Sequence, residues 1–374
     1  MRKRRQLTIV VVGVLTFCIL GWALAYYFVG VDWAFIAGMV RARTADGRPS
    51  MFVAPAGVEV TIYADGLDAP TSLAWSPDGV LYVADGSRAG GAGRITALTQ
   101  PDRRVTVAED IPAPLGIVFH DGWLYIGRRG GVTRLRDTNS DRVADTIEPI
   151  IDGLPALRHQ TDGIAFGPDG RMVIGQGSRS DRGELVGIEP LEASILVADA
   201  DGSNLRVYAS GLRNPYDLAF HPQTRELFAT DNGRDVPSQG VSDELNVIVD
   251  GGDYGWPDCW DQDEGSNCEG AVAPIALFEE HGSANGLAFY AGSMFPQWRD
   301  NLFVALFGAN SGDPSIGKQV VRVELMRALS GEWVGKVYPW ASGFANPLDV
   351  TVGPDGAIYV ADFGAGKVYR FAAP

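Results

Sequence analysis

One short pattern recurs six times along the chain. An apolar strand runs into a tight turn, and a second apolar strand then ends in a polar loop, as in Ser72–Asp85. Asp-Gly between apolar runs is typical of β-hairpins, because glycine accepts the positive φ that such turns need. The turns fall near residues 78, 121, 169, 224, 300 and 355. Four-stranded propeller blades need about 40–50 residues each, so the spacing predicts an all-β fold, a six-bladed β-propeller.

Further apolar segments supply the remaining strands of this prediction. Third and fourth strands fit Gly93–Leu98, Val132–Leu135, Ala193–Ala198 and Val320–Leu325. The segment Val58–Tyr63 is expected to close the ring beside Lys367–Phe371. We therefore assign residues 57–374 to the propeller domain. The loops that precede the six inner strands should meet at one mouth of the central channel: residues 69–71, 113–114, 159–162, 213–215, 283–285 and 346–347.

The N-terminus differs from the rest of the chain. No charged residue occurs from Leu7 to Val31, and residues 2–5 are all basic. As a helix, this apolar run would span roughly 37 Å, enough to cross a bilayer. We predict one transmembrane helix within residues 1–31, with a basic cytoplasmic tip, and a juxtamembrane linker over 32–56. The propeller is then expected on the periplasmic or extracellular side of the cell membrane. A cleaved signal peptide, which has a shorter apolar core, is the alternative.

Charge narrows the range of partners. The net charge is −15, and because residues 1–43 carry +5, the rest of the chain carries −20. Such a body repels phosphate backbones, so no nucleic-acid partner is expected. An anionic ligand would need a local basic pocket.

Two of the three cysteines, Cys259 and Cys268, lie nine residues apart in an acidic loop. No spacing of Cys and His suggests a zinc site. We predict a disulfide between them if the domain faces an oxidising compartment. Two free thiols are the alternative.

Few side chains at the predicted mouth can carry chemistry. His159 precedes an inner strand, and its imidazole can take a proton near neutral pH; His281 also lies near the mouth. The other two histidines, His120 and His221, fall in hairpin turns and are expected on the solvent side. A loop histidine paired with backbone is the alternative for His159.

Two cationic side chains could bind an anionic ligand there. Arg213 directly precedes an inner strand together with Asn214, and its planar fork suits carboxylates and flat ligands. Lys318 follows a glycine-containing loop. A salt bridge to a neighbouring loop and a solvated lysine are the respective alternatives.

An oxygen-rich stretch follows the fourth hairpin. Carboxylates, amides and glycines in such a loop suit Ca²⁺, which takes 6–8 oxygen ligands. An acidic surface loop is the alternative. The stretch contains Asp231, Asn232, Asp235, Asp243, Glu244, Asp250 and Asp253.

These motifs together resemble the glucose/sorbosone dehydrogenase family. The resemblance covers roughly residues 57–372, is most specific between residues 211 and 257, and is closest to the L-sorbosone dehydrogenase-like branch. The family implies a six-bladed propeller that uses pyrroloquinoline quinone (PQQ) and Ca²⁺. The motifs that carry the resemblance are His159 with Gly163–Gly170, Gly211–Pro215, Thr230–Asp235, Asp243–Asn246, Gly252–Pro257, Phe303–Gly308 and Lys318–Val323.

The resemblance implies a role for each matching residue. His159 would be the general base that takes the proton of a sugar hydroxyl. Arg213 would lie against the cofactor with Asn214 beside it, and Lys318, Asn232 and Asp243 would complete the cofactor site. The carbonyls of Gly233 and Arg234 would hold one Ca²⁺, and Glu244 with the carbonyl of Tyr254 a second, structural one.

The expected function is therefore that of a membrane-anchored quinoprotein oxidoreductase. It would oxidise an aldose or a sorbosone-like alcohol or aldehyde, with hydride transfer to PQQ and electrons passing to an external quinone or cytochrome. Relatives that oxidise glucose carry an Arg-x-Arg-Asp stretch before the last inner strand, where this chain has Asn346, Pro347, Leu348 and Asp349. Two alternatives are a Ca²⁺-dependent lactonase-type hydrolase and a cofactor-free binding propeller.

Overall fold

The structure of the protein is a computed structural model. It describes residues 39–43, 49–88, 91–100, 103–185, 189–235, 241–262, 264–265, 267–309 and 315–374. The predicted transmembrane helix within residues 1–31 lies outside this part of the chain. Within it, no helix has the length and apolar character needed to cross a bilayer.

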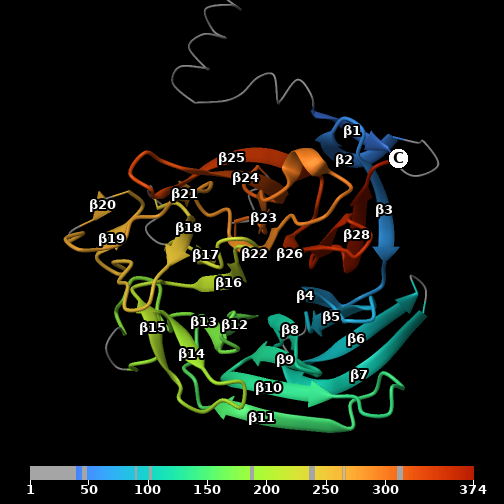
Figure 1. Ribbon diagram of the computed structural model, residues 1–374, viewed down its shortest axis with the longest axis horizontal. Coiled ribbons are helices and arrows are strands. Elements are labelled where there is room, and N and C mark those ends of the chain that lie inside the picture. Colours follow the sequence, from blue (N-terminus) through green and yellow to red (C-terminus); the bar gives the residue numbers. More distant parts are fainter. Residues whose placement is uncertain are drawn as a thin grey trace, which may run out of the picture.

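The described chain forms a six-bladed β-propeller, as predicted, with the blades arranged around a central channel (Figure 1). Each of the first four blades is an antiparallel sheet of four strands. Blade 1 contains β4 (Ala69–Trp75), β5 (Leu81–Gly86), β6 (Ala92–Gln100) and β7 (Arg103–Pro112). Blade 2 contains β8 (Gly116–His120), β9 (Trp123–Arg128), β10 (Gly131–Arg136) and β11 (Thr146–Asp152).

Blades 3 and 4 surround one side of the channel. Blade 3 contains β12 (Thr161–Phe166), β13 (Met172–Gln176), β14 (Ser194–Ala198) and β15 (Arg206–Ser210). Blade 4 contains β16 (Pro215–Phe220), β17 (Leu227–Asp231), β18 (Glu244–Ile248) and the short β21 (Ala276–Leu277). A two-stranded excursion between β18 and β21 contains β19 (Cys259–Trp260) and β20 (Glu264–Gly265).

Blades 5 and 6 complete the ring. Blade 5 contains β22 (Ala284–Phe289), β23 (Leu302–Leu306), β24 (Gln319–Arg327) and β25 (Trp333–Ser342), with one 3₁₀ turn at Pro296–Trp298. Blade 6 contains β26 (Pro347–Val352), β27 (Ile358–Asp362), β28 (Lys367–Ala372) and, as its outer strand, β3 (Glu59–Ala64). The pairing of β3 with β28 confirms the predicted closure, which joins the two ends of the propeller.

The predicted linker over 32–56 needs a correction in its second half. Residues Met39–Arg43 and Pro49–Pro55 form β1 and β2, a hairpin that joins the outer edges of blades 5 and 6. Val53 pairs with Ser342 of β25, and Arg43 with Glu59 of β3. Phe52 is 2 % exposed and packs on Phe344 and Tyr369. Burial of this ring makes residues 49–55 part of the propeller body.

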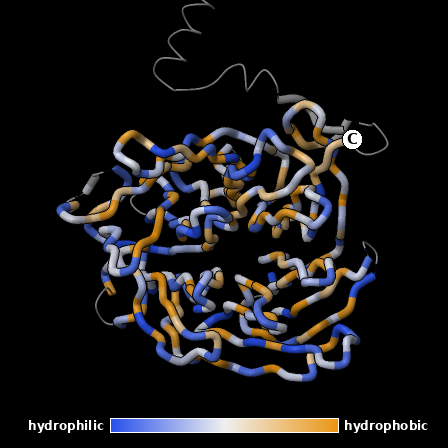
Figure 2. Tube along the Cα trace, in the orientation of Figure 1, coloured by the Kyte–Doolittle hydropathy of each residue, from blue (hydrophilic) through white to orange (hydrophobic). Residues whose placement is uncertain are grey.

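The hydrophobic core consists of six separate clusters, one between each pair of neighbouring blades. Apolar stretches lie within the strands, and hydrophilic ones in many of the turns (Figure 2).

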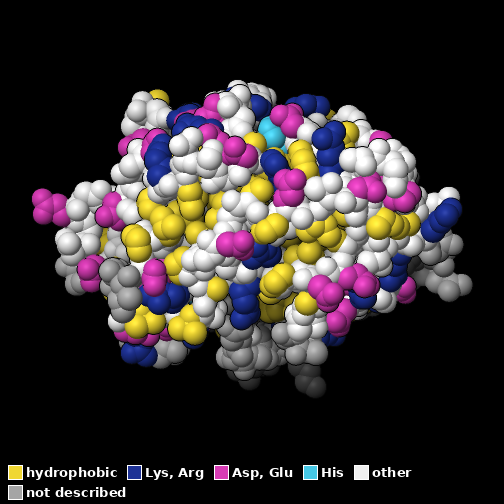
Figure 3. Space-filling model, turned by 90° about the horizontal axis from the view of Figure 1, so that it is seen from below, with side chains coloured by type: hydrophobic (Ala, Val, Ile, Leu, Met, Phe, Trp, Pro, Cys, Tyr) yellow, Lys and Arg dark blue, Asp and Glu magenta, His cyan; other side chains and the backbone are white. Residues whose placement is uncertain are grey.

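His221, which was expected on the solvent side, is buried instead. It is 4 % exposed, because its ring packs against Phe289 and Trp333. On the flank shown in Figure 3, acidic and basic side chains are interspersed, so charge is not gathered there in a patch of one sign.

Five of the six inner strands contain a register shift near the channel, in β4, β12, β16, β22 and β26. Such bulges re-aim side chains at functional sites. Side chains at these bulges also bind the next blade: Leu287 N donates to Asp217 (2.9 Å), and Leu73 N donates to Asp349 (2.6 Å). The inner strands of blades 4 and 5, and those of blades 6 and 1, are therefore hydrogen-bonded to each other.

Candidate functional site

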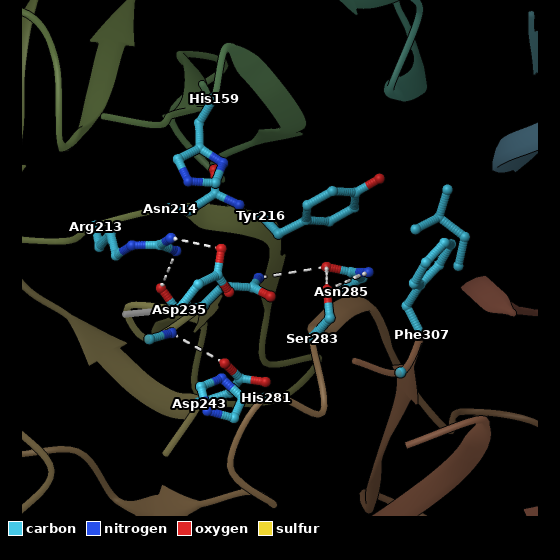
Figure 4. Close-up of a pocket in the computed structure, with 14 residues that line it drawn as sticks. His159, Arg213, Asn214, Tyr216, Asp235, Asp243, His281, Ser283, Asn285 and Phe307 are labelled. Carbon is cyan, nitrogen blue, oxygen red and sulfur yellow. Dashed lines mark hydrogen bonds and ion pairs between the residues drawn. The ribbon is translucent and has the colours of Figure 1, made fainter. Parts of the chain in front are cut away.

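A cavity of about 210 Å³ opens at the mouth of the channel (Figure 4). Residues of blades 3, 4, 5 and 6 line it. Its walls come from several of the loops that the sequence predicted to meet. Six of the candidate site residues line it: His159, Arg213, Asn214, Asn232, Gly233 and Asp243. His281, Ser283 and Asn285 join them from blade 5. The remaining candidates, Lys318, Arg234, Glu244 and Tyr254, do not line this cavity.

Backbone hydrogen bonds fix the loops of blades 3 and 4 against each other. His159 N donates to Ser178 O (3.2 Å), Ser178 N donates to Arg213 O (2.8 Å), and Asn232 N donates to Asn214 O (3.2 Å). Gly177 lies at this junction, where a Cβ atom would collide with both His159 and Asn214. The close approach of the two blades thus depends on this glycine.

His159 presents an uncharged imidazole at the cavity. Its Nε2 atom is buried and has no hydrogen-bond partner. Burial, followed by the positive charges of Arg213 and Arg158, lowers the pKa of His159 to about 3. The imidazole is therefore uncharged at neutral pH and can accept a proton from a group placed in the cavity.

Arg213 lines the cavity and also forms salt bridges. The structural alternative is therefore confirmed, and ligand binding by this residue stays a prediction. Its side chain is 2 % exposed and pairs with Asp181 (2.7 Å) and with Asp235 (3.4 Å). Its main-chain N–H and that of Asn214 donate to the carboxylate of Asp231 (3.0 and 2.6 Å). The loop is therefore held through both its backbone and its guanidinium group.

Asn232 and Asp243 connect blade 4 to blade 5 across the cavity. The amide of Asn232 donates to Ala284 O (2.9 Å) and to Asn285 Oδ1 (3.3 Å). The carboxylate of Asp243 accepts from Gly233 N and Ala284 N, both at 2.9 Å. Burial raises the pKa of Asp243 to about 7. Both side chains thus hold the loops that form the cavity wall.

Lys318 lies beside the cavity and not on its wall. A Cβ atom added to Gly308, which does line the cavity, would lie 3.0 Å from Cγ and 3.5 Å from Cε of Lys318. Lys318 has a φ of 54°. Its side chain therefore passes along the backbone of Gly308 at the rim.

The remaining candidates gather around a second, smaller cavity of about 20 Å³ behind Gly233, lined by Arg234, Glu244 and Tyr254 among others. Glu244 accepts from Asp261 N (2.7 Å) and from Asn246 Nδ2 (3.1 Å). Burial raises the pKa of Glu244 to about 8. The Arg234 guanidinium lies over the Trp260 ring, 3.9 Å from its centre.

The described residues around the small cavity offer oxygen ligands, but their carboxylates do not surround a common point. The Oδ1 atom of Asn246 is buried without a partner beside the Glu244 carboxylate. Across the described residues, no group of three or more His, Cys, Asp or Glu side chains is placed to share a metal. A cation in this cavity would therefore rely on carbonyl and amide oxygens, which suits Ca²⁺.

The predicted disulfide is confirmed. Cys259 and Cys268 are bonded, with their Cα atoms 5.0 Å apart. Cys259 lines the small cavity behind Gly233, so the disulfide lies against the second candidate site.

Two residues of the site carry no motif in the sequence. Tyr216 lines the cavity, and Asp181 binds Arg213. Tyr216 follows Pro215 at the bulge of β16, so an alignment of the six inner strands could have found it. Asp181 lies in a loop without repeat pattern, 32 residues before Arg213, and no sequence pattern marks it.

Comparison with known proteins finds relatives that match most of the chain. A family model described as "Glucose / Sorbosone dehydrogenase" matches residues 127–370, well over half of the chain. The aldose sugar dehydrogenase of Escherichia coli is 25 % identical over 86 % of this chain and 94 % of its own. A solved structure of a putative oxidoreductase (glucose dehydrogenase) from Thermus thermophilus is 29 % identical, covers 84 % of this chain and all of its own, and has a TM-score of 0.67. The PQQ domain of a pyranose dehydrogenase from Coprinopsis cinerea, 20 % identical with a TM-score of 0.71 over 86 % of this chain and 97 % of its own, shares the fold.

Proposed function

The chain belongs to the glucose/sorbosone dehydrogenase family, and from this premise we propose that it is a quinoprotein that oxidises a sugar. In this proposal PQQ occupies the cavity between blades 3 and 6, and Ca²⁺ is its accompanying ion. The substrate is an aldose or a sorbosone-like alcohol or aldehyde. Names of relatives, among them a quinoprotein glucose dehydrogenase B from Acinetobacter calcoaceticus, support the chemical class.

The observation that carries the proposal is a set of buried polar atoms without hydrogen-bond partners in the cavity wall. They are His159 Nε2, His281 Nε2, Asn214 Oδ1 and the Tyr216 hydroxyl. Each such atom costs about 1–3 kcal/mol when it stays unpaired. Four of them around one cavity fit a ligand that presents several oxygen and nitrogen atoms, as PQQ does.

Each cavity residue then has a defined task. Bound PQQ supplies the acceptor for the hydride that leaves the sugar carbon. His159 accepts the proton of the reacting sugar hydroxyl at its free Nε2 atom, for which its uncharged state is required. Arg213 and, from the rim, Lys318 provide positive charge for an anionic ligand in a body that otherwise repels anions.

Calcium is proposed on the same terms. Gly233 lines both cavities and Arg234 lines the smaller one. In the proposal their carbonyls would hold the ion beside the cofactor. Glu244 and the carbonyl of Tyr254 would hold a second ion in the small cavity. A divalent cation at either place supplies Lewis-acid or structural charge that the side chains of this chain do not provide.

We also propose that the propeller is tethered to the outer side of a membrane by residues 1–31. The basic tip and uncharged run of the sequence motivate the tether, and the disulfide between Cys259 and Cys268 suits an oxidising compartment. Electrons would leave to an external quinone or cytochrome.

One second candidate, a cofactor-free binding propeller, is favoured by a specific observation. Leu348 lines the cavity at a position where glucose-oxidising relatives carry an arginine, and Asn346 uses its amide to hold Phe307 O (3.1 Å). The site therefore has fewer cations than the resemblance implies. The lactonase alternative lacks such support, since the described residues offer no set of carboxylates placed for a metal.

Activity on defined sugars separates these functions. The full chain, purified in detergent and supplied with PQQ and Ca²⁺, is given a panel of aldoses, ketoaldehydes and lactones with an artificial electron acceptor. The proposal expects acceptor reduction with at least one aldose or aldehyde, and no reduction after Ca²⁺ chelation or without PQQ. Lactone hydrolysis without acceptor reduction would favour the hydrolase, and inactivity despite bound PQQ would contradict a dehydrogenase.

A further inference from the structure

The guanidinium group of Arg213 is held along its edge. Its Nε–H donates to Asp181 O (3.2 Å), and one Nη1–H donates to Asn232 O (3.0 Å). Its Nη2 group donates to Asp181 Oδ1 (2.7 Å) and to Asp235 Oδ2 (3.4 Å). Asp181 thus binds Arg213 through both its main chain and its side chain, and the acceptors come from two different loops.

These contacts use four of the five N–H groups that an arginine offers. An arginine that binds a carboxylate with its fork needs two parallel N–H groups free. Arg213 no longer has such a pair, although its side chain lines the cavity. What it can still present to a ligand is one N–H and the flat face of its guanidinium, which stacks on conjugated rings.

Asp181 is itself fixed in place. It is 8 % exposed, and its Oδ1 atom also accepts from Asp235 N (2.9 Å). Arg158 lies on its other side, with Nε 3.7 Å from Oδ1, and forms a second ion pair with Asp235. Arg182 also approaches Asp181, with Nε 4.0 Å from Oδ2. Two arginines and two aspartates form one ion-paired group, which we call the mouth network: Arg158, Asp181, Arg213 and Asp235.

We propose that Asp181 is a positioning residue for the cofactor: it occupies the fork of Arg213 and so makes Arg213 present a flat face to the cavity. This inference rests on the proposed function, because it assigns the planar ring system of the quinone, and not its carboxylates, to Arg213. Simple anions such as sulfate would then be poor competitors for this residue. The carboxylates would depend on other groups at the site.

An electrostatic role and a positioning role of Asp181 predict opposite changes in PQQ affinity when this residue is substituted. Asp181→Asn removes a negative charge within 3 Å of Arg213, so electrostatics alone would make an anionic quinone bind more tightly. If Asp181 acts by position, the freed guanidinium rotates and binding weakens. The direction of the change therefore decides between the two roles.

The test uses the full chain in detergent, with two readouts. The first is the dissociation constant for PQQ at fixed Ca²⁺ and salt. We expect at least tenfold weaker binding for Asp181→Asn and recovery of most of the loss in Asp181→Glu, which keeps the charged acceptor. The second readout needs no cofactor: phenylglyoxal labelling of Arg213, followed by peptide mass spectrometry, should be slow in the wild type and in Asp181→Glu, and at least tenfold faster in Asp181→Asn.

A matched pair in blade 1 controls for loss of structure. Asp85 is fully buried, pairs with Arg94 (2.9 Å) and accepts from Ala69 N (2.7 Å), far from the cavity. Asp85→Asn should leave PQQ affinity and Arg213 labelling unchanged. Labelling of Arg322, which is 8 % exposed in blade 5, reports global unfolding and should stay slow in every variant.

Each outcome decides the proposal. Unchanged or tighter PQQ binding by a folded Asp181→Asn variant would overturn it, as would unchanged labelling of Arg213. If the wild type binds no PQQ, the proposed function fails, while the labelling experiment still shows whether Asp181 fixes Arg213. If wild type binds PQQ and only the Asp181 variants behave otherwise than expected, the function stands and the positioning role falls.

Discussion

The two halves of the channel mouth are built from the same repeat but bring different chemistry to it. At matching positions of the inner strands, blades 3, 4 and 5 place Asp162, Tyr216 and Asn285. Blades 6, 1 and 2 place Leu348, Thr71 and Leu115 there. The backbone thus fixes where a side chain stands, and the residue chosen at that place decides whether the position is reactive.

Cavities follow the same division. The cavity that contains His159 and Arg213 is lined mainly by blades 3 to 5. A third cavity, of about 400 Å³, borders blades 1, 2 and 6 and is distinct from the small cavity behind Gly233. The residues that line it include Pro112, Ala113, Pro114 and Phe363. We call these regions the polar half and the apolar half of the mouth. The comparison teaches that buried polar atoms without partners line the cavity of the polar half, where the proposed redox chemistry would take place. The following predictions test this proposal.

The largest effect is expected for the base of the polar half. His159→Ala should lower sugar oxidation by about 10²–10⁴-fold, the usual contribution of a positioned base, while PQQ affinity changes little. Steady-state turnover and a PQQ titration of the same preparation measure the two quantities.

His221→Ala is the matched control. His221 is buried in the hairpin turn of blade 4, where its Nδ1 accepts from Thr224 N (3.1 Å). Its loss should lower the melting temperature and leave turnover per folded molecule intact. Equal losses of turnover in both variants would mean that His159 acts only through stability.

The next effect concerns cofactor retention. Arg213→Ala should weaken PQQ binding at least tenfold, because it removes the flat guanidinium face and the one N–H left for a ligand. Arg213→Lys should recover only part of the affinity because lysine lacks the flat face. Titration of metal-loaded, cofactor-free protein gives the values. Arg94→Ala in blade 1 is expected to bind like the wild type, and wild-type affinity in Arg213→Ala would remove this residue from the site.

A third prediction concerns pH and calcium. Burial raises the pKa of Asp243 to about 7 and of Glu244 to about 8, above the values of about 4 in an unfolded chain. The folded state therefore binds more protons than the unfolded state. The contribution of these two carboxyl groups to the free energy of unfolding is greatest below pH 4 and is lost as the pH rises toward 8.

Thermal melts measure this dependence. With a chelator present, the melting temperature of the protein should decrease from pH 5 to pH 8 as these groups ionise. In Glu244→Gln this decrease should be smaller. Excess Ca²⁺ should reverse the trend, because a bound cation favours the ionised carboxylate. A wild-type profile that is the same with Ca²⁺ and with chelator would argue against an ion at Glu244.

The smallest effect comes from changing the apolar half. Leu348→Arg restores an arginine that glucose-oxidising relatives carry, so PQQ binding should tighten by a few fold and become more sensitive to salt. Leu115→Arg, at the matching position of blade 2, should have no such effect because Leu115 lines the cavity of the apolar half and not that of the polar half. Equal gains in both variants, measured by titration at two salt concentrations, would show that general charge and not position is at work.

The repeat of apolar strands and turns in the sequence predicted much of the fold. Alternating apolar strands around Asp-Gly turns identified the hairpins of all six blades, and the closure by β3 could be inferred from one leftover apolar segment. The β1–β2 hairpin could not, because Met39–Arg43 and Pro49–Pro55 lie outside the repeat and pair with strands far along the chain, such as Val53 with Ser342. Long-range pairing of an isolated segment leaves no local pattern.

The site was predictable to the extent that repeat geometry governs it. His159, Arg213 and Asn214 meet because each ends a loop before an inner strand, and the sequence already places those loops at one mouth. The partners of Arg213 were not predictable, since Asp181 comes from a loop between β13 and β14 that follows no repeat. Lys318 was expected in the site, but its side chain lies along Gly308 at the rim.

We propose that the polar half of the mouth binds the quinone. Hydrogen–deuterium exchange of the full chain with Ca²⁺, in the presence and absence of PQQ, tests where the quinone binds. We expect PQQ to slow exchange in peptides that cover residues 157–162, 211–216, 230–235 and 281–286, and to leave residues 69–72 and 113–116 unchanged. Slower exchange confined to the apolar half, or no change in either half at saturating PQQ, would contradict the claim.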